Sequence, residues 1–515
     1  MFIKIAMLVV FFGVMIGVGI YCKRHATDVN GFVLGGRNVG PWLTAFAYGT
    51  SYFSAVIFVG YAGKFGWAFG VAATWIGIAN ALLGSLLAWV VLGRRTRVMT
   101  RHLDSATMPQ FFGERFGSNP LKVFASVIIF IFLIPYTASL YSGLSRLFEM
   151  AFPVRYEVCV IVMAVLTGIY VIAGGYMATA INDFIQGIVM LVGIVAVVIA
   201  VLNTNGGFIG SLNKLAEVND ATVSKTPGIF ASFFGPDPMG LLGVMILTSL
   251  GTWGLPQMVQ KFYAIKSEKS ISKGTVISTV FATVVAGGCY FLGGFGRIFA
   301  TSEEVAAGGF DSIVPNMLKD LSPVLIAVVI VLVLSASMST LSSLVLTSSS
   351  TLTLDFILPL KKKEMKEKTQ LITMRSLIVV FVAVSAVIAI LQYKNPASIG
   401  FIADLMGISW GALAGAFLAP FLYGLYWKRV TKVACFVNFI FSSVFMSLVQ
   451  FCKGIFPTFF QSPVNAGAFC MLFGMILVPI VSIFTKAPEK EKVEEIFACY
   501  DQKVVVSAKD SIGQE

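Results

Sequence analysis

Hydroxyl side chains gather in the segment SASMSTLSS, residues 335–343, at a spacing that could bind a cation. The residues that recur every three or four positions, and so share one face of a helix, are Ser335, Ser339, Ser342, Ser343 and Thr347. Such hydroxyls often bond to carbonyls of their own helix or let two helices approach closely, which is the structural alternative. The tight group of Ser339, Thr340, Ser342 and Ser343 favours a cation site. Small neutral oxygens at one depth can replace the water of a hard monovalent ion when carbonyls of an unwound helix complete the shell.

Two carboxylates lie within or at the edge of apolar segments: Asp183 in AINDFIQGIVM and Asp404 in GFIADLMGISWG. Acidic residues are costly inside a membrane and usually serve a function there. Asp183 is expected near the inner end of its segment, at the depth of the hydroxyl group, and is a candidate cation ligand. Asp404 is expected nearer the outer end of its segment, as a gate or as the partner of a helix terminus.

These residues belong to a chain with the composition of a membrane protein. Of its 515 residues, 57% are hydrophobic and 12% are charged, and the mean hydropathy is +0.87. Thirteen segments reach the roughly 20 apolar residues that cross about 30 Å of hydrocarbon. Their ranges are 2–21, 41–63, 70–92, 121–148, 157–177, 184–202, 240–260, 274–299, 322–350, 373–392, 399–425, 432–452 and 465–485. The sequence therefore predicts an all-α integral membrane protein with about 13 transmembrane helices in the cell membrane.

Basic residues are distributed unevenly among the connections between these segments. With thirteen crossings, one side holds 25 of the 37 Lys and Arg, including RRTR at 94–97, the stretch from Lys261 to Lys273, KKK at 361–363 and the lysines after 485. The other side holds eight. Because cytoplasmic loops carry the excess of Lys and Arg, the N-terminus is predicted outside and the C-terminus inside. The same distribution accounts for the net charge of +12 without a nucleic-acid partner.

The sequence does not favour an enzyme. Its two histidines, His25 and His102, lie in basic connections, and no zinc site, histidine-based triad or Walker loop can be assembled. The seven cysteines are scattered and odd in number, which predicts free thiols. Residues 1–485 are expected to form one transmembrane domain, followed by a charged cytoplasmic tail over 486–515. Function is therefore expected among the helices.

Two of the predicted spans have features that break a helix. Residues that interrupt the second and seventh spans are Gly49, Thr50, Ser51 and Ser54, and Gly251, Gly254 and Pro256. Gly and Pro are common in membrane helices, but transporters place broken helices at corresponding positions of two inverted repeats. The two spans are five apart, which predicts a 5+5 core with repeats at about 41–202 and 240–425. One helix precedes this core and two follow it.

Four motifs resemble the sodium:solute symporter family, which includes bacterial proline, pantothenate and sialic acid carriers and the sodium-glucose carriers. The motifs are GGRNVGPWLTAFAYGTSYFSA, GGYMATAINDFIQG, GTWGLPQMVQKF and SASMSTLSSLVLTSSS. The resemblance covers nearly the whole chain. It implies the leucine-transporter (LeuT) fold with an extra first helix, and alternating access around the two broken helices.

The resemblance also implies sodium as the coupling ion, with no organic cofactor. The first sodium site would use the carbonyls of Thr50, Phe53 and Ala336 and the hydroxyls of Ser339 and Thr340. Some relatives have a second sodium site, whose positions correspond here to Asp183, Ser339, Ser342 and Ser343. Two sodium ions per cycle is therefore a hypothesis for this chain.

Positions that enclose the solute in proline carriers differ here. Tyr52 stands in place of an acidic residue, Ala55 in place of a glycine, and Thr248 and Thr252 in place of a Trp and a Tyr. The replacement of those two aromatic residues by Thr248 and Thr252 disfavours proline and suggests a pocket with more room or more hydrogen-bonding capacity. Tyr136 matches a family tyrosine that faces the substrate. The other pocket candidates are Ser54, Trp253, Gln257 and Trp410.

Together these features predict a sodium-coupled symporter that imports a small organic solute across the lipid bilayer. Arg37, in the matching motif Gly35-Gly36-Arg37, is expected either to take part in inner gating or to be a positive-inside charge. Proton coupling through Asp183 is an alternative, although hydroxyls can ligate a metal ion and cannot carry a proton at ordinary pH. A channel or sensor that kept the fold would need more polar stripes than the one found, and an embedded enzyme would need histidine at membrane depth. The solute could be an amino acid, carboxylate, vitamin or sugar, and the oligomeric state is left open.

Overall fold

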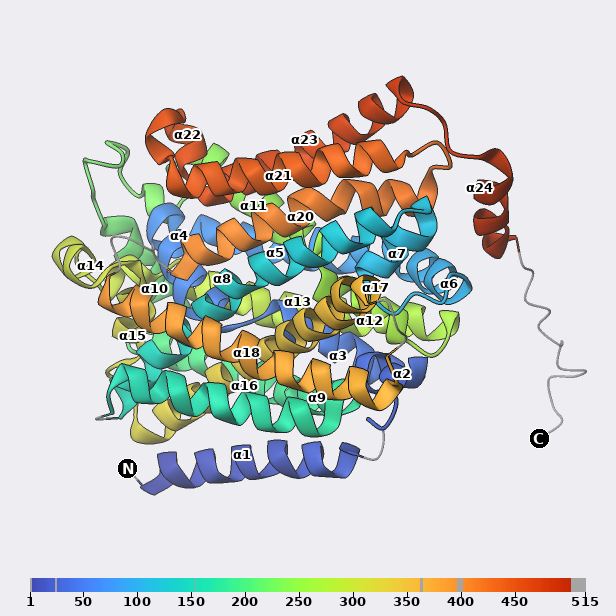
Figure 1. The fold of residues 1–515 in the computed structure, drawn as a ribbon. Helices are drawn as coiled ribbons and strands as arrows, with labels where there is room; N and C mark the ends of the chain where they lie inside the picture. Colours follow the sequence, from blue (N-terminus) through green and yellow to red (C-terminus); the bar gives the residue numbers. More distant parts are fainter. Residues whose placement is uncertain (1, 24–25, 153, 362–364, 396–401, 502–515) are drawn as a thin grey trace, which may run out of the picture.

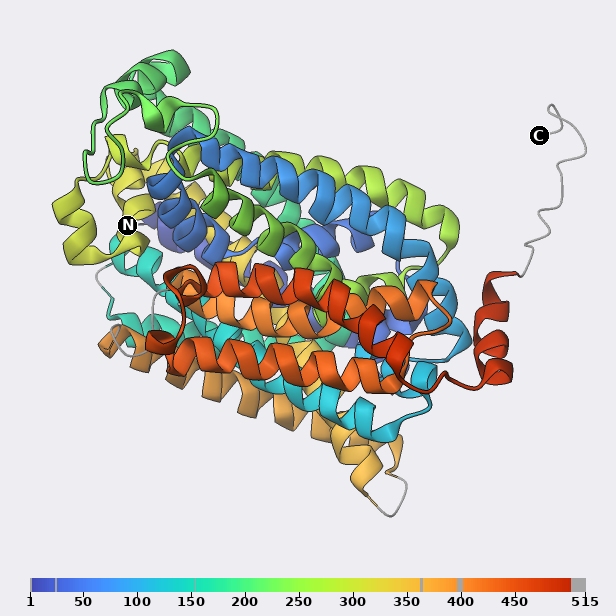
Figure 2. The ribbon, with the colours of Figure 1, turned by 90° about the horizontal axis from the view of Figure 1, so that it is seen from above.

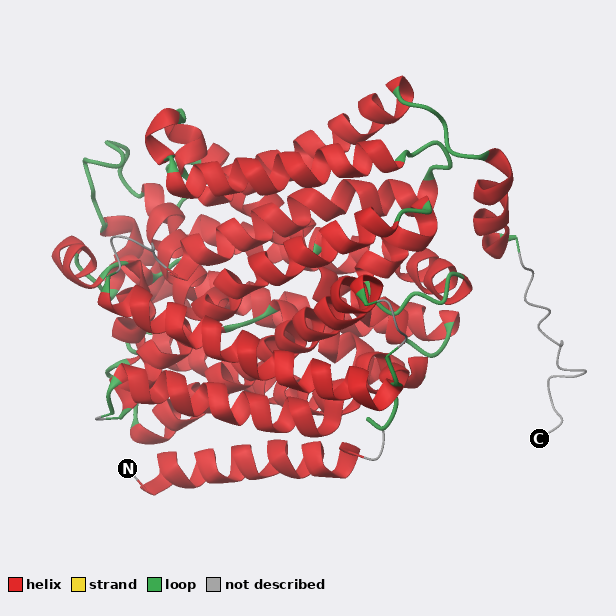
Figure 3. Cartoon of the chain, viewed as in Figure 1, coloured by secondary structure: helices red, strands yellow, loops and turns green. Residues whose placement is uncertain are grey.

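The computed structural model describes residues 2–23, 26–152, 154–361, 365–395 and 402–501. Within these ranges the regular secondary structure is helical, apart from one isolated bridge between Val39 and Ile265. Figure 3 shows helices joined by short connections. The parts of the earlier predictions that fall outside the described residues are Arg24, His25, Lys362, Lys363, the first residues of the span 399–425, and the tail from 502 onward.

The long helices form most of the molecule. They are α1 (Phe2–Cys22), α8 (Asn119–Ala151), α9 (Tyr156–Asn203), α13 (Glu268–Gly293), α16 (Pro323–Thr351), α18 (Glu367–Lys394), α20 (Ile402–Tyr426), α21 (Lys432–Phe451) and α23 (Pro463–Phe484). The interrupted helices are α3 (Pro41–Tyr52), η3 (Val56–Tyr61) and α4 (Ala62–Phe69), then η4 (Gly70–Ala73), α5 (Thr74–Ala79), η5 (Asn80–Leu87), η6 (Trp89–Gly93) and α6 (Arg94–His102), and the pair α11 (Pro238–Gly254) and α12 (Pro256–Ala264). Proline stands in the first turn of α3, α8, α11, α12, α16 and α23, where its missing N–H removes no helix hydrogen bond.

Short helices connect these elements. They are α2 (Val29–Leu34), η2 (Gly35–Arg37), α7 (Met108–Phe116), α10 (Gly207–Glu217), η7 (Ile229–Ala231), η8 (Gly296–Ile298), α14 (Ser302–Gly308), η9 (Phe310–Ser312), α15 (Ile313–Leu318), η10 (Leu352–Ile357), α17 (Leu358–Leu360), η11 (Lys453–Ile455), α22 (Thr458–Gln461), α24 (Lys490–Phe497) and η12 (Ala498–Tyr500).

Helices of spanning length coincide with the predicted apolar segments. In the described residues, 10 helices are long and apolar enough to cross a membrane, or up to 11 if the bent pair α11 and α12 is one span. The helix α9 has 48 residues, so if straight it would be about 72 Å long, more than twice the hydrocarbon thickness. It is kinked at Gly175, where φ is 55°, near the end of the fifth predicted span. Gly70, with φ of 61°, likewise follows α4 at the first residue of the third predicted span. The number thirteen stays a prediction.

The helices lie side by side and end at two opposite faces of the molecule (Figures 1 and 2). In Figure 1, α10, α14 and α22 lie at one end, where α1 begins, and α2, α6 and α24 lie at the other. The basic segment RRTR at 94–97 is part of α6 and therefore lies at the end opposite the start of α1. This arrangement agrees with the predicted separation of basic connections from the N-terminus.

The hydroxyl-rich helix α16 is surrounded by protein. It packs against α9, α8, α3 and α18, and every residue from Ala327 to Thr351 except Val328 is buried. Its side chains therefore meet other helices along nearly their whole length. This explains why the segment tolerates many hydroxyls, because lipid would leave them without partners.

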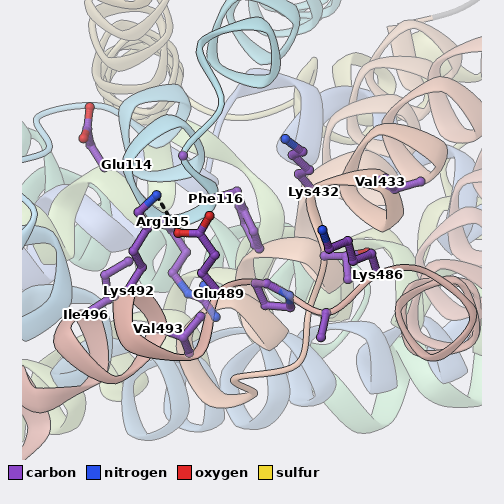
Figure 4. Close-up of a pocket in the computed structure, with 14 residues that line it drawn as sticks. Glu114, Arg115, Phe116, Lys432, Val433, Lys486, Glu489, Lys492, Val493 and Ile496 are labelled. Atoms are coloured by element: carbon purple, nitrogen blue, oxygen red, sulfur yellow. Dashed lines mark ion pairs between the residues drawn. The ribbon is translucent and has the colours of Figure 1, made fainter.

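The described part of the tail packs on the end of the molecule near α6. The α24 helix places Phe497 under the guanidinium of Arg115, 4.9 Å from the ring centroid, and Lys428 forms an ion pair with Glu494. Burial lowers the pKa of Arg115 to about 10, so this side chain stays protonated at neutral pH. Figure 4 shows the cavity between α7, the start of α21 and α24, of about 400 Å³, with the ion pair of Glu489 and Lys492 at its edge.

Candidate functional site

The second predicted span is broken at Phe53. The helix α3 ends at Tyr52, Phe53 is extended with φ of −89° and ψ of 121°, and helical backbone resumes at Ala55. The amide of Phe53 still donates to the carbonyl of Gly49, 3.2 Å away. The break leaves the carbonyls of Thr50 and Phe53 free to accept from another helix.

Five oxygens from the predicted first sodium site meet at this break. The hydroxyl of Thr340 lies 3.0 Å from the carbonyl oxygen of Thr50, 3.2 Å from that of Phe53 and 3.1 Å from that of Ala336. The hydroxyl of Ser339 lies 3.1 Å from the carbonyl oxygens of both Thr50 and Ala336. All five residues are buried. Neutral, closely spaced oxygens of this kind fit a hard monovalent cation, since each hydroxyl and carbonyl has lone pairs to offer.

The residues of the expected second site also lie close together, but a lysine lies among them. The Nζ atom of Lys261, on α12, is 3.0 Å from the Oγ of Ser343 and 3.8 Å from a carboxylate oxygen of Asp183. Ser343 also hydrogen-bonds with Ser51, next to the break. The hydroxyl of Ser342 donates to the carbonyl of Ser339. The sequence-based placement of Lys261 in a basic connection is wrong, because α12 continues the bent span and buries this residue to 2% exposure.

The seventh predicted span is broken at Leu255. The axes of α11 and α12 differ by 44°, and Leu255 between them is extended, with φ of −76° and ψ of 122°. Gln257 therefore lies in the first turn of α12, and its side-chain amide is buried with no hydrogen-bond partner among the described residues. Gly251, one turn before the break, faces Trp410, since an added Cβ would lie 2.7 Å from its Cε3.

Three aromatic residues of the predicted pocket form one cluster. The ring of Trp410 has its centroid 5.7 Å from that of Tyr52 and 5.9 Å from that of Tyr136. In the part of the chain that the structure describes, the hydroxyl of Tyr52 has no hydrogen-bond partner. The polar atoms of Tyr136, Trp410 and Ser54 likewise make no hydrogen bond of ordinary geometry. Buried polar groups left this way are suited to a polar ligand, because burial without a partner is costly.

The other pocket candidates make contacts elsewhere. The hydroxyl of Thr252 donates to Gly84 and Ser249 carbonyls, and the indole N–H of Trp253 donates to the Leu83 carbonyl. Both residues therefore contact η5, on a different side of α11 from the face that meets Trp410. The hydroxyl of Thr248 donates to the carbonyl of Val244 in its own helix. Ala55 lies against Gly143 of α8.

The two predicted gating residues lie at opposite ends of the bundle. Asp404, in the first turn of α20, accepts from Nζ of Lys64 on α4 at 2.8 Å. It also lines a cavity of about 830 Å³ at the end where α14 lies. Arg37 donates to the carbonyl of Ser105 at 2.8 Å and lies 3.6 Å from the exposed carboxylate of Asp104. Each residue thus joins two segments that are far apart in the sequence.

A further buried acid was not predicted. Asp355, in η10, is fully buried and accepts from the hydroxyl of Thr107 at 2.6 Å. Its other carboxylate oxygen has no hydrogen-bond partner among the described residues. The predicted span ended at residue 350, although the apolar letters of FILPL after Asp355 indicate that the helix continues.

A family model matches most of this chain. The model described as the sodium:solute symporter family matches residues 32–442. The chain belongs to the sodium:solute symporter family. It is 29% identical over 485 residues to the osmoregulated proline transporter OpuE of Bacillus subtilis (strain 168), covering 93% of this chain and 94% of that protein. It is 31% identical over 434 residues to a sodium/proline symporter of Staphylococcus aureus (strain JH9), covering 83% of this chain and 81% of that protein.

A solved structure of a Na⁺-coupled sialic acid symporter is similar in fold. The TM-score is 0.73 at 16% sequence identity, with 95% of this chain and 99% of that chain covered. The family assignment and the all-helical membrane fold of LeuT type are thus confirmed. The exact helix count, the two repeats and the roles of the site residues stay predictions for this member of the family.

Proposed function

We propose that this protein is a sodium-coupled symporter that imports a small organic solute by alternating access. The observation that carries the proposal is the contact of the Ser339 and Thr340 hydroxyls with the carbonyls freed at the break after Tyr52. A dehydrated sodium ion needs closely spaced oxygen ligands, and this cluster of hydroxyls and carbonyls would supply them. The sodium ion would be transported together with the solute.

The geometry explains how sodium and solute binding would be coupled. Thr50 and Phe53 contribute carbonyls to the sodium site, and Tyr52, between them, contributes its ring and hydroxyl to the aromatic cluster with Trp410. A sodium ion that bridges the break to α16 would therefore fix the backbone that carries Tyr52. Binding of each ligand would stabilise the form that the other prefers, and the effect is reciprocal.

The two ends of the bundle supply candidate closures for alternating access. The ion pair of Lys64 and Asp404 joins α4 to α20 at the end with the large cavity, and Arg37 joins η2 to residues 104–105 at the other end. With the basic end in the cytoplasm, as proposed, the first pair is the outer closure and Arg37 belongs to the inner one.

The driving force is sufficient for uptake. One charge that crosses about 100 mV supplies about 2.3 kcal/mol, and a tenfold sodium gradient supplies about 1.4 kcal/mol more. The sum supports a concentration ratio of a few hundred for a neutral solute with one ion per cycle.

The solute is proposed to be amphipathic. The rings of Tyr52, Tyr136 and Trp410 offer an apolar surface, while the Gln257 amide and the Tyr52 hydroxyl offer unused hydrogen-bonding groups. The two relatives named above are proline transporters, so proline is the first compound to test, although Thr248 and Thr252 were expected to disfavour it.

The test is the thermal stability of the purified protein with a panel of metabolites, with sodium or potassium as the only cation. A ligand that binds only the folded state raises its free energy of unfolding by RT ln(1 + c/Kd), where c is the ligand concentration. Symport predicts a compound that stabilises the protein much more in sodium than in potassium. Equal stability in both salts for every compound would contradict a sodium site at Ser339 and Thr340.

A further inference from the structure

Lys261 is a buried cation beside the buried carboxylate of Asp183. Its side chain is 3% exposed and that of Asp183 is fully buried, with 3.8 Å between Nζ and the nearer carboxylate oxygen. Neither oxygen of Asp183 accepts a hydrogen bond from any described residue, and Lys261 is the only described side chain whose charge lies within ion-pair distance. The negative charge of Asp183 is therefore balanced by a cation that belongs to the protein.

The Lys261 ammonium contacts the groups expected to ligate a second sodium ion. It donates to the Ser343 hydroxyl at 3.0 Å, and the ring of Tyr176 lies below it, 5.2 Å from Nζ to the centroid. Asp183, Ser343 and an aromatic face thus surround one positive charge. Hydroxyl, carboxylate and π-face are all groups that an ammonium binds well.

A sodium ion at the same place would add a second positive charge to one carboxylate. In a buried region with little water, two close like charges repel strongly and only one is neutralised. The first sodium site differs, because its five oxygens are neutral and have no lysine among them. The two groups of ligands share α16 but differ in whether a protein cation is already present.

We infer that the Lys261 ammonium takes the place of a second sodium ion, so that this symporter binds one sodium ion per cycle. The inference rests on the proposed sodium coupling at Ser339 and Thr340 and deepens it. A tethered cation cannot leave with the solute, so it links α12 to α9 and α16 without adding to the transported charge. The free energy available to drive solute uptake is then that of one sodium ion per cycle.

The decisive experiment counts bound sodium on the purified full chain by equilibrium binding of radioactive sodium. One ion is expected for the wild type and for Lys266→Met, a matched control that removes an exposed lysine five residues further along. Lys261→Ala removes the ammonium group and leaves the Asp183 carboxylate without a cation from the protein. Two bound sodium ions are therefore expected for this variant. The double variant Lys261→Ala with Asp183→Asn is expected to return to one, because the second ion loses its carboxylate.

Several results would overturn the inference. Two sodium ions bound to the wild type would overturn the inference and leave the proposed sodium symport intact. This measurement does not depend on the folding of any variant. One ion on a folded Lys261→Ala variant would also do so. Lys261→Arg, which keeps a tethered charge, is expected to bind one ion, and two would contradict the proposed role of the lysine. No bound sodium on the wild type would overturn the proposed function and this inference together.

Discussion

Thr340 contacts the broken helix more extensively than Ser339, the other hydroxyl of the proposed first sodium site. Its hydroxyl contacts three carbonyl oxygens, two of which come from the broken helix and one from its own helix. A hydroxyl in a membrane helix normally bonds only to its own backbone. The contacts across the break are therefore what distinguish this threonine from the others of α16.

At the residue scale, Thr340→Val is expected to weaken sodium binding about 10- to 100-fold. The change keeps the volume but removes one oxygen ligand, and a hydrogen bond to a charged group contributes about 1.5–3 kcal/mol. The measurement is the thermal shift over a sodium titration, which gives the sodium Kd because the stabilisation is RT ln(1 + c/Kd), where c is the sodium concentration. Thr340→Ser keeps the hydroxyl and is expected to bind sodium as the wild type does; equal sodium Kd values for all three proteins would refute this ligand.

Gln257 provides the corresponding test for the solute. Gln257→Leu removes both polar atoms that lack a partner in the described structure, so solute binding is expected to fall at least about tenfold while sodium binding without solute is kept. Solute binding and sodium binding are both measured as thermal shifts, with a solute identified in the metabolite panel. Gln461→Leu, on the exposed helix α22, is the control and is expected to change neither. Unchanged solute affinity in Gln257→Leu would place the pocket elsewhere.

At the element scale, the bend between α11 and α12 depends on close contact with α20. An added Cβ at Gly254 would lie 2.8 Å from both the Cα of Ala414 and the amide nitrogen of Leu418. These are backbone atoms, which cannot move aside as a flexible side chain can. The glycine therefore sets how near the bend lies to the helix that carries Trp410.

Gly254→Ala is expected to destabilise the protein by about 1–3 kcal/mol, because the two helices must separate to admit the methyl group. The matched control is Gly287→Ala in α13, where no atom lies within 4 Å of the added Cβ. That change is expected to be neutral or to stabilise by up to about 1 kcal/mol through helix propensity. The two variants are compared by their midpoints of thermal unfolding in the absence of ligands. Equal midpoints would show that α20 moves to admit the methyl group at little cost in stability.

At the scale of the whole molecule, the described tail closes against the basic end. Phe497 is 6% exposed and packs with Arg115, and η12 places the ring of Tyr500 4.5 Å from the guanidinium of Arg95. The described part of this charged tail, α24 and η12, covers residues from α6 and α7. Docking of this kind depends on two aromatic side chains more than on the exposed ion pairs.

Phe497→Ala is therefore expected to release α24 and to speed tryptic cleavage after Lys490 and Lys492 by about tenfold or more. Burying a phenylalanine side chain contributes about 1.5–3 kcal/mol, and cleavage follows the population of the released form. Limited proteolysis with mass spectrometry gives the rates. Glu495→Ala changes an exposed residue of the same helix and is expected to be cleaved as slowly as the wild type. Equal rates for Phe497→Ala would show that other contacts hold the tail.

The sequence alone determined the class of the protein and predicted the residues of the proposed first cation site. A segment with enough consecutive apolar residues forms a spanning helix whatever its neighbours are. The spacing of hydroxyls along one helix determines which of them share a face. Glycine and proline weaken helix hydrogen bonds locally, so both breaks could be predicted within a few residues. The family followed from motifs that cover nearly the whole chain.

Which charged side chains meet depends on how the helices pack in three dimensions. Lys261 and Asp183 are separated by 78 positions and lie on different helices, so no periodicity relates them, and the lysine was assigned to a connection because it falls just past a predicted span. The same holds for Lys64 with Asp404, and for Thr252 and Trp253, whose side chains contact η5 away from the aromatic cluster. Such partners depend on how helices rotate and pack, which is set by contacts between distant segments and not by the local sequence of either one.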